Sequence, residues 1–205
     1  MTENITVDMT NLSTKEREQL LALITKANPK WEMPKNLNPG DIFKDLDGDE
    51  WIFLYSETET GNVCILKKDA LSNMVFGSNN NYNRSAIDLH LTNTYLKELE
   101  RKFGAENIMG HEVDLLSLDG EDDYGKIVRK VSIPTLDVYR KNKKAIKNYI
   151  DERFWLATPN STPSGDGSDF VLETYNDGNV IRRCFANCGA VRPMLILKTE
   201  PIPFE

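Results

Sequence analysis

The sequence predicts an α+β fold in which antiparallel strands at both ends of a main domain enclose two main helices, with a short amphipathic helix in front. Two observations support this prediction. Apolar segments separated by turn residues, which are typical of antiparallel strands, occupy residues 42–67 and 154–198. Between them, residues 86–103 carry apolar side chains at helical spacing, and residues 134–150 begin with Pro-Thr and concentrate lysines toward their C-terminal half, as a helix dipole favours. Strands grouped around central helices favour α+β over a regular alternation of strand and helix.

The short N-terminal helix is predicted over residues 12–26. Ser13 or Thr14 can cap its start, and glutamates follow in the first turn. Residues 28–40 contain three prolines and a glycine, which prevent helix continuation and are typical of a linker. We therefore expect residues 1–38 to be a helix with a proline-rich linker, and residues 39–205 to be the α+β domain.

The first strands of the main domain are expected at residues 42–44, 50–55 and 62–67. Residues 45–49 and 60–62 between them are rich in Asp, Asn and Gly, which favour tight turns. Short turns join neighbouring antiparallel strands, so these segments should form a small meander.

Two helices are expected next, each preceded by polar residues. Ser85 is placed to cap a helix over residues 86–103, after the polar loop 79–84. Pro134 and Thr135 are placed to begin a second helix that extends to about Ile150. The acidic residues 119–123 between the two helices are expected to form a solvated loop.

The terminal third should return to strands. They are expected at residues 154–156, 169–175, 180–185 and 191–198, with residues 176–179 as a hairpin turn.

Composition narrows the classes of function. The chain has 205 residues, a net charge of −7 and a pI near 5.0, which disfavour direct binding to a phosphate backbone. No apolar run approaches the ~20 residues that cross a bilayer, and the first residues lack the pattern of a secretory signal. We expect a protein made in a cytoplasm, with no membrane association. Three cysteines without a CxxC spacing favour buried thiols over a disulfide scaffold or a zinc site.

Several segments are similar to one known family. These are residues 40–43 (Gly-Asp-Ile-Phe), 50–52 (Glu-Trp-Ile), 83–87 (Asn-Arg-Ser-Ala-Ile), 154–159 (Phe-Trp-Leu-Ala-Thr-Pro) and 189–193 (Gly-Ala-Val-Arg-Pro). They resemble successive blocks of domain of unknown function 6273, over about residues 40–198. The family is met in Gram-positive bacteria and their phages, so the resemblance implies a phage or prophage protein that acts in the host cell cytoplasm or in the phage particle.

The last of these segments are also similar to the end of the C-type-lectin-like fold shared by phage receptor-binding proteins and formylglycine-generating enzymes. The resemblance implies a lectin-like arrangement of the main domain. Members of domain of unknown function 6273 often carry Arg-Ser-Pro where this chain has Ala157-Thr158-Pro159, so a role for that arginine is not implied here.

The chain offers few residues for catalysis. His90 is expected within a helix and His111 in a loop, and neither belongs to a catalytic motif. Cys184 and Cys188 would suit a thiol or copper enzyme of the formylglycine-generating type only if a turn brought their sulfurs together, so we interpret them as core thiols. We expect no enzyme activity and no cofactor.

Two oxygen-rich segments are candidates for calcium. Asp45, Asp47 and Asp49 alternate along one turn, but glycine and glutamate are missing where an EF-hand needs them, so a turn with side-chain hydrogen bonds is preferred and no metal is expected. The second segment is loop 160–169. Because recognition residues usually lie on loops, we predict a ligand-binding surface on loops 79–84 and 160–169. Its predicted ligand-binding residues are Asn81, Tyr82, Asn160, Ser161, Asp166 and Asp169.

Three further residues are predicted to have structural roles. Trp51 and Trp155 begin apolar strands and are expected to anchor the core. Arg192 lies in an apolar strand, where an unpaired guanidinium is costly, so we expect it to pair with a buried carboxylate.

The leading hypothesis is a non-enzymatic protein that recognises a protein or glycan partner through its loops. The alternative is a phage counter-defence protein, in the manner of an anti-CRISPR, whose acidic surface binds a host immune nuclease. A thiol or copper enzyme is a third hypothesis. The N-terminal helix could add assembly into a homo-oligomer.

Overall fold

The computed structural model describes residue 10 and residues 12–27 and 31–199, and it confirms an α+β architecture with mostly antiparallel strands. The chain divides into two units, residues 1–31 and 32–205. The first contains helix α1 (Thr14–Ala27). Glu16 Oε2 accepts hydrogen bonds from the backbone N–H (2.9 Å) and the hydroxyl (2.6 Å) of Ser13, so these two residues close the start of α1 as a capping box.

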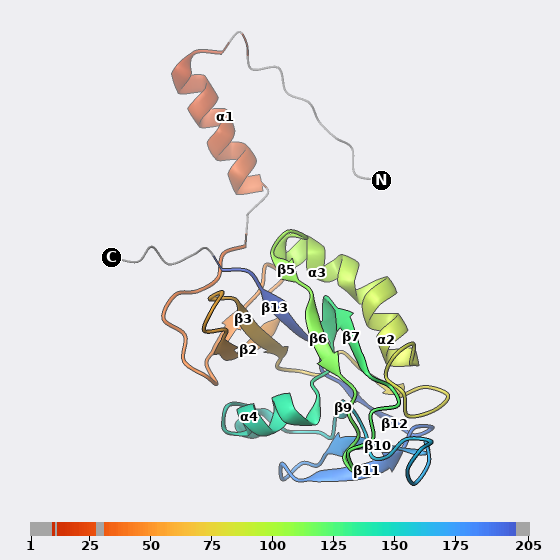
Figure 1. Ribbon diagram of the computed structural model, residues 1–205. Helices are drawn as coiled ribbons and strands as arrows, with labels where there is room; N and C mark the ends of the chain where they lie inside the picture. Colours follow the sequence, from red (N-terminus) through yellow and green to blue (C-terminus); the bar gives the residue numbers. More distant parts are fainter. Residues whose placement is uncertain (1–9, 11, 28–30, 200–205) are drawn as a thin grey trace. The chain divides into compact units, whose positions relative to one another are not determined.

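The main unit is built on a six-stranded antiparallel sheet (Figure 1). Its order is β1 (Ile42–Lys44), β2 (Glu50–Ser56), β3 (Val63–Lys67), β13 (Met194–Leu197) and β5 (Ile108–Met109), and β8 (Val131–Ser132) also pairs with β13. The predicted meander is confirmed, because β2 pairs antiparallel with both β1 and β3. Strand β13, the last strand of the chain, then pairs antiparallel with β3 of this meander, and Ile196 lies opposite Cys64.

Three smaller sheets complete the main unit. Strands β9 (Trp155–Pro159), β10 (Phe170–Thr174) and β11 (Val180–Cys184) form one of them, and the predicted hairpin turn at residues 176–179 is confirmed by the β10–β11 pairing. The others pair β12 (Cys188–Val191) with β4 (Ser72–Val75), and β6 (His111–Asp114) with β7 (Lys126–Arg129). Strands β4 to β8 were not predicted, because they are short and lack an alternating apolar pattern.

The expected final strand 191–198 is divided between two sheets. Strand β12 ends at Val191 beside β4, and β13 begins at Met194 beside β3. Pro193 lies between them and has no N–H to donate to a ladder, so a continuous strand is unfavourable at this point.

Both predicted helices are present, and one has a local irregularity. Residues 86–103 form α2 (Ala86–His90), a π-helical turn (Leu91–Tyr95) and α3 (Leu96–Phe103), with Ser85 as the N-cap of α2. The second helix, α4 (Leu136–Ile146), continues as a 3-10 turn over Lys147–Tyr149. Thr135 caps α4 by accepting a hydrogen bond from the N–H of Val138.

The principal core lies where α4, the six-stranded sheet and the β9–β10 strands meet. Helix α4 packs against β2 and β9. Fully buried side chains come from β2, β3, α4 and β9, for example Leu54, Leu66, Ile146 and Leu156. This core fixes the end of β9 and the start of α4, from which the candidate site is built. No helix in the described part of the chain has the length and apolarity needed to cross a membrane.

Candidate binding surface formed by three loops

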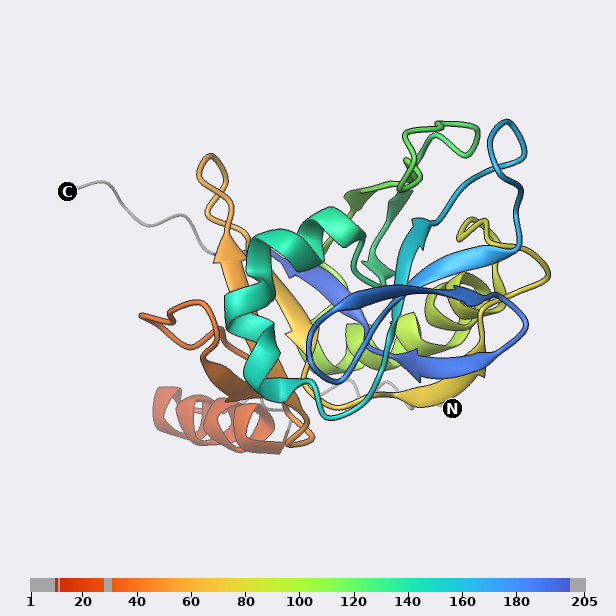
Figure 2. The ribbon, with the colours of Figure 1, turned by 90° about the horizontal axis from the view of Figure 1, so that it is seen from below.

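Three loops of the main unit lie together on one side of it, and we call them the loop surface (Figure 2). They are residues 79–84 before α2, residues 115–125 between β6 and β7, and residues 160–169 between β9 and β10. The sequence predicted that the first and the third carry recognition residues. The structure brings these two together and places the acidic loop 115–125 beside them.

Asn80 joins all three loops. Its side chain is fully buried, and its Nδ2 donates hydrogen bonds to the carbonyl oxygens of Ser161 (2.7 Å) and Phe170 (3.0 Å). Its Oδ1 accepts a hydrogen bond from the hydroxyl of Tyr124 at 2.7 Å. The side-chain amide therefore fixes loop 160–169 and the end of loop 115–125 against loop 79–84. The sequence contained a weak signal for this role, because four of residues 79–83 are asparagines.

Loops 115–125 and 160–169 are also bound directly to each other. Asp123 accepts hydrogen bonds from the N–H (2.9 Å) and the hydroxyl (2.7 Å) of Ser164, and the N–H of Leu118 donates to Pro159 O at 3.0 Å. Gly165 passes so close that a β-carbon there would lie 3.0 Å from Asp119 Oδ2. The two loops therefore present one continuous surface.

That surface is negatively charged. Six carboxylates on it form no ion pair with any residue in the described part of the chain; they are Asp119, Glu121, Asp122, Asp123, Asp166 and Asp169. Residues 115–125 and 160–169 contain no lysine or arginine, and loop 79–84 contributes one exposed cation, Arg84. Hydrogen bonds from Ser117 and Ser161 lower the pKa of Asp119, and those from Ser164 lower the pKa of Asp123. Both carboxylates therefore keep their charge in mildly acidic solution.

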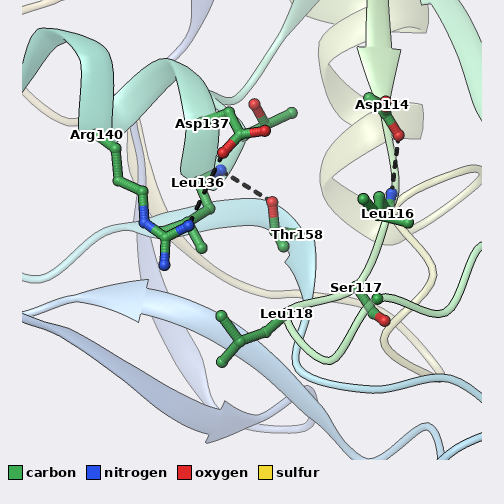
Figure 3. Close-up of a pocket in the computed structure, with 10 residues that line it drawn as sticks. Asp114, Leu116, Ser117, Leu118, Leu136, Asp137, Arg140 and Thr158 are labelled. Carbon is green, nitrogen blue, oxygen red and sulfur yellow. Dashed lines mark hydrogen bonds and ion pairs between the residues drawn. The ribbon is translucent and has the colours of Figure 1, made fainter.

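A pocket of about 190 Å³ opens beside the acidic loop (Figure 3). Leu116 and Leu118 line it on the loop side, and Leu136 and Arg140 of α4 line the other side. Thr158, at the end of β9, accepts a hydrogen bond from the N–H of Leu136 at 2.9 Å, which holds the start of α4 against the pocket. The pocket thus has apolar walls, and it lies between the start of α4 and the acidic loop 115–125.

The predicted ligand-binding residues are only partly on this surface. Asp166 and Asp169 are exposed, and Asn81 and Asn160 are half-buried. Tyr82 is fully buried, and its hydroxyl oxygen accepts a hydrogen bond from the N–H of Ile133, so its assignment as a ligand contact is wrong and it belongs to the core. Ser161 is also buried; its hydroxyl oxygen accepts the N–H of Asp166 and shapes the loop. Sequence reasoning missed Asn80, Leu116 and Leu118.

The first calcium candidate is a turn whose carboxylates face lysines. Asp45 Oδ1 accepts the N–H groups of Asp47 (2.9 Å) and Asp49 (3.0 Å), which confirms the predicted turn with side-chain hydrogen bonds. Lys102 of α3 is buried, and its Nζ lies 3.3 Å from Asp45 and in hydrogen-bonding contact with Asp49. Among the residues that the structure describes, no group of three or more His, Cys, Asp or Glu is arranged to hold a metal ion.

Neither histidine belongs to the loop surface. His90 ends α2, as expected. His111 begins strand β6 and is buried, so the expectation of a loop was wrong: the backbone on both sides of Gly110 is extended. Its Nε2 is 2.9 Å from Ser132 Oγ, and loss of hydration lowers its pKa to about 4. The imidazole is therefore neutral at pH 7.

The prediction of core thiols is confirmed for one cysteine and wrong for two. Cys64 is buried, and burial raises the pKa of its thiol to about 12. Cys184 is half-buried and Cys188 is exposed, because they flank a surface turn in which the N–H of Asn187 donates to Cys184 O at 3.0 Å. All three are free thiols.

The residues predicted to be structural are all deeply buried. Trp51 donates its Nε1–H to Asp45 Oδ2 and Trp155 donates to Met74 O, each at 3.0 Å. Arg192 donates to the carbonyl oxygens of Lys67 (3.0 Å) and Tyr149 (3.2 Å) and lies over the ring of Phe154. The expected carboxylate partner is therefore wrong: carbonyl dipoles and an aromatic face surround this guanidinium, and burial lowers its pKa to about 10.

Comparison with known proteins gives no relative for this chain: no family model, no curated protein and no solved structure matches it. The fold and the loop surface therefore define the class no further than an α+β protein with mostly antiparallel strands, and the resemblance to domain of unknown function 6273 stays a prediction.

Proposed function

We propose that this protein is a non-enzymatic binding protein, encoded by a phage or prophage, that recognises a protein or glycan partner through the loop surface. In this proposal the main unit is a C-type-lectin-like frame. One observation carries the proposal: the buried side chain of Asn80 holds three polar loops as one preformed surface. Ordering loops before binding reduces the entropy lost on association, which favours a role in recognition.

The acidic charge supports a second candidate, a counter-defence protein that binds a host immune nuclease. Nucleases carry positively charged channels for nucleic acid. The six carboxylates of the loop surface, which have no ion pair with any described residue, are complementary to such a channel. This candidate predicts that expression of the protein raises phage plating on a host with an active nuclease defence. Equal plating with and without the protein would remove it.

The binding proposal is tested by replacing the exposed tip of loop 160–169. The tip is Pro-Ser-Gly-Asp-Gly-Ser at residues 163–168, and the variant carries Pro163→Gly, Ser164→Gly and Asp166→Ser there, so that Asn160, Ser161 and Asp169 remain. The full chain and this variant are applied to a glycan array and a random-peptide display library. We expect the full chain to select specific members of one collection, and the variant to lose at least about tenfold in affinity, as for removal of an interface hot spot.

A matched control replaces the turn at residues 58–60, between β2 and β3, with a Gly/Ser segment of equal length. This turn is exposed and does not belong to the loop surface. The control should bind as the unmodified chain does. Selection of no specific ligand, or equal binding by the loop variant, would contradict the proposal.

A further inference from the structure

We propose that the partner of the loop surface is a basic polypeptide segment that inserts an apolar side chain into the pocket between Leu118 and α4 and places lysine or arginine residues against the acidic loops. This inference rests on the proposed function and specifies the chemistry of the partner.

The apolar part of the recognition is assigned to the pocket wall. Leu116 and Leu118 are 45% and 48% exposed although they adjoin a cavity, so each leaves apolar surface in contact with water. Leu136 adds a buried apolar wall from α4. A cavity of about 190 Å³ has room for one aliphatic or aromatic side chain. Burying these leucines against such a side chain is favourable at roughly 25 cal/mol per Å² of apolar surface.

The charged part of the recognition is assigned to the acidic loop, because this loop runs directly along the rim of the pocket. Ser117 and Gly120 both line the pocket, and Asp119 lies between them in the sequence. The N–H of Gly120 donates to Ser117 O, so the acidic loop turns directly at the rim of the pocket. A segment whose apolar residue occupies the pocket therefore continues over Asp119 and the neighbouring carboxylates.

The sign of the charge decides the partner. The six carboxylates of the loop surface have no ion pair within the described part of the chain, whereas the one arginine that lines the pocket, Arg140, lies 3.9 Å from Asp137. An acidic or phosphorylated segment would meet these six like charges, against one cation, Arg140, in the pocket lining. Lysine and arginine side chains instead supply the missing cations, and they accelerate association at low ionic strength.

The test begins with selection from a random-peptide display library by the full chain, with an unrelated protein of similar acidity as the counter-selection. Enriched peptides should carry a net positive charge together with a recurring apolar residue. A synthetic copy of one enriched peptide is then titrated into the protein by fluorescence anisotropy at about 50 and about 500 mM NaCl, between which the screening length shortens roughly threefold.

Two pairs of matched variants locate the site. Leu118→Ala should weaken the peptide about tenfold, whereas Leu89→Ala, which changes a leucine of similar exposure (46%) on α2, should not. The triple change Glu121→Gln, Asp122→Asn and Asp166→Asn should weaken binding at low salt and flatten its salt dependence. The control changes Glu32→Gln, Glu59→Gln and Glu106→Gln, which together remove three exposed charges outside the loop surface, and it should leave both unchanged.

The outcomes separate the two proposals. The selection could instead enrich neutral or acidic peptides, or the protein could bind a glycan, with that binding lost in the loop-tip variant. Such a result would overturn the proposal of a basic partner and leave the proposed binding function intact. Basic peptides that bind Leu118→Ala and the triple variant as tightly as the unmodified chain would overturn the assigned site. Failure to select any peptide or glycan above the counter-selection protein would overturn both.

Discussion

Trp51 donates its indole N–H to Asp45 Oδ2 at 3.0 Å, and the same carboxylate oxygen lies 3.3 Å from the ammonium of Lys102. Asp45 and Lys102 are both fully buried, and Asp45 also accepts two backbone N–H groups of its own turn. One carboxylate therefore joins the β1–β2 turn, the tryptophan at the start of β2 and helix α3. In this aspartate-rich turn, the ammonium of Lys102 from α3 therefore takes the place that a cation would occupy.

Removing Lys102 should be strongly destabilising. In Lys102→Met the apolar part of the side chain is kept, but the buried carboxylate of Asp45 loses its cation, while Asp49 keeps Lys67 at 3.1 Å. We expect a loss of about 3 kcal/mol in the free energy of unfolding, measured by urea denaturation, because a buried charge is left unpaired. Arg101→Met is the control: its side chain is 59% exposed and pairs with Asp47, so it should cost less than ~1 kcal/mol. Equal effects would contradict this account.

Stability should fall between pH 6.5 and pH 4 because of His111. Its folded-state pKa is about 4, below the ordinary value of 6.5, so the unfolded chain binds more protons in this window. Acidification therefore favours unfolding, by up to roughly 3 kcal/mol if the full pKa difference acts. Urea denaturation across this range should show the decline in the unmodified chain and a much weaker one in His111→Gln. The pKa of Asp49 is lowered from its ordinary value of 3.8, so the stability that Asp49 contributes is lost only when the pH falls below about 3.8. An unchanged slope in His111→Gln would contradict the assignment.

The loop surface should lose its order when Asn80 is changed. Asn80→Ala removes both bonds from Nδ2 and leaves the carbonyl of Ser161 without this buried donor, which should cost ~1–3 kcal/mol. Amide hydrogen exchange should accelerate in residues 160–169 and leave β2 and β3 protected. Tyr124→Phe removes only the bond to Asn80 Oδ1 and should have a smaller effect. Unchanged exchange in Asn80→Ala would show that the loops are held by other contacts.

The three thiols should differ in reactivity. A water-soluble disulfide reagent should modify Cys188 first and Cys184 more slowly, because one is exposed and the other half-buried. Cys64 is buried, and its pKa is raised to about 12, so it should react only after unfolding. Counting released thiolate in the native chain, in Cys188→Ser and in Cys184→Ser assigns each phase. Rapid modification of all three thiols in the native chain would contradict the burial of Cys64.

Sequence reasoning worked where local patterns are strong. The meander at residues 42–67, the hairpin turn at 176–179, the cap at Ser85 and the helix start near Pro134 and Thr135 were all predicted, since each depends on neighbouring residues. It failed for Tyr82, because a tyrosine in a polar loop gives no local sign of burial. It failed for the partners of Arg192, because Lys67 O and Tyr149 O lie on elements distant in the sequence.

The sequence by itself determined the α+β class, the acidic charge and the two polar loops, because these depend on composition and short-range periodicity. Tertiary structure decided which charges are neutralised and which remain free. It places Lys102 beside the Asp45 turn, and it leaves the carboxylates of the acidic loop 115–125, next to the pocket, without an ion pair among the described residues. The physical reason is that pairing between charges depends on distance and burial in the folded chain, and residues about fifty positions apart become neighbours only when the core has packed.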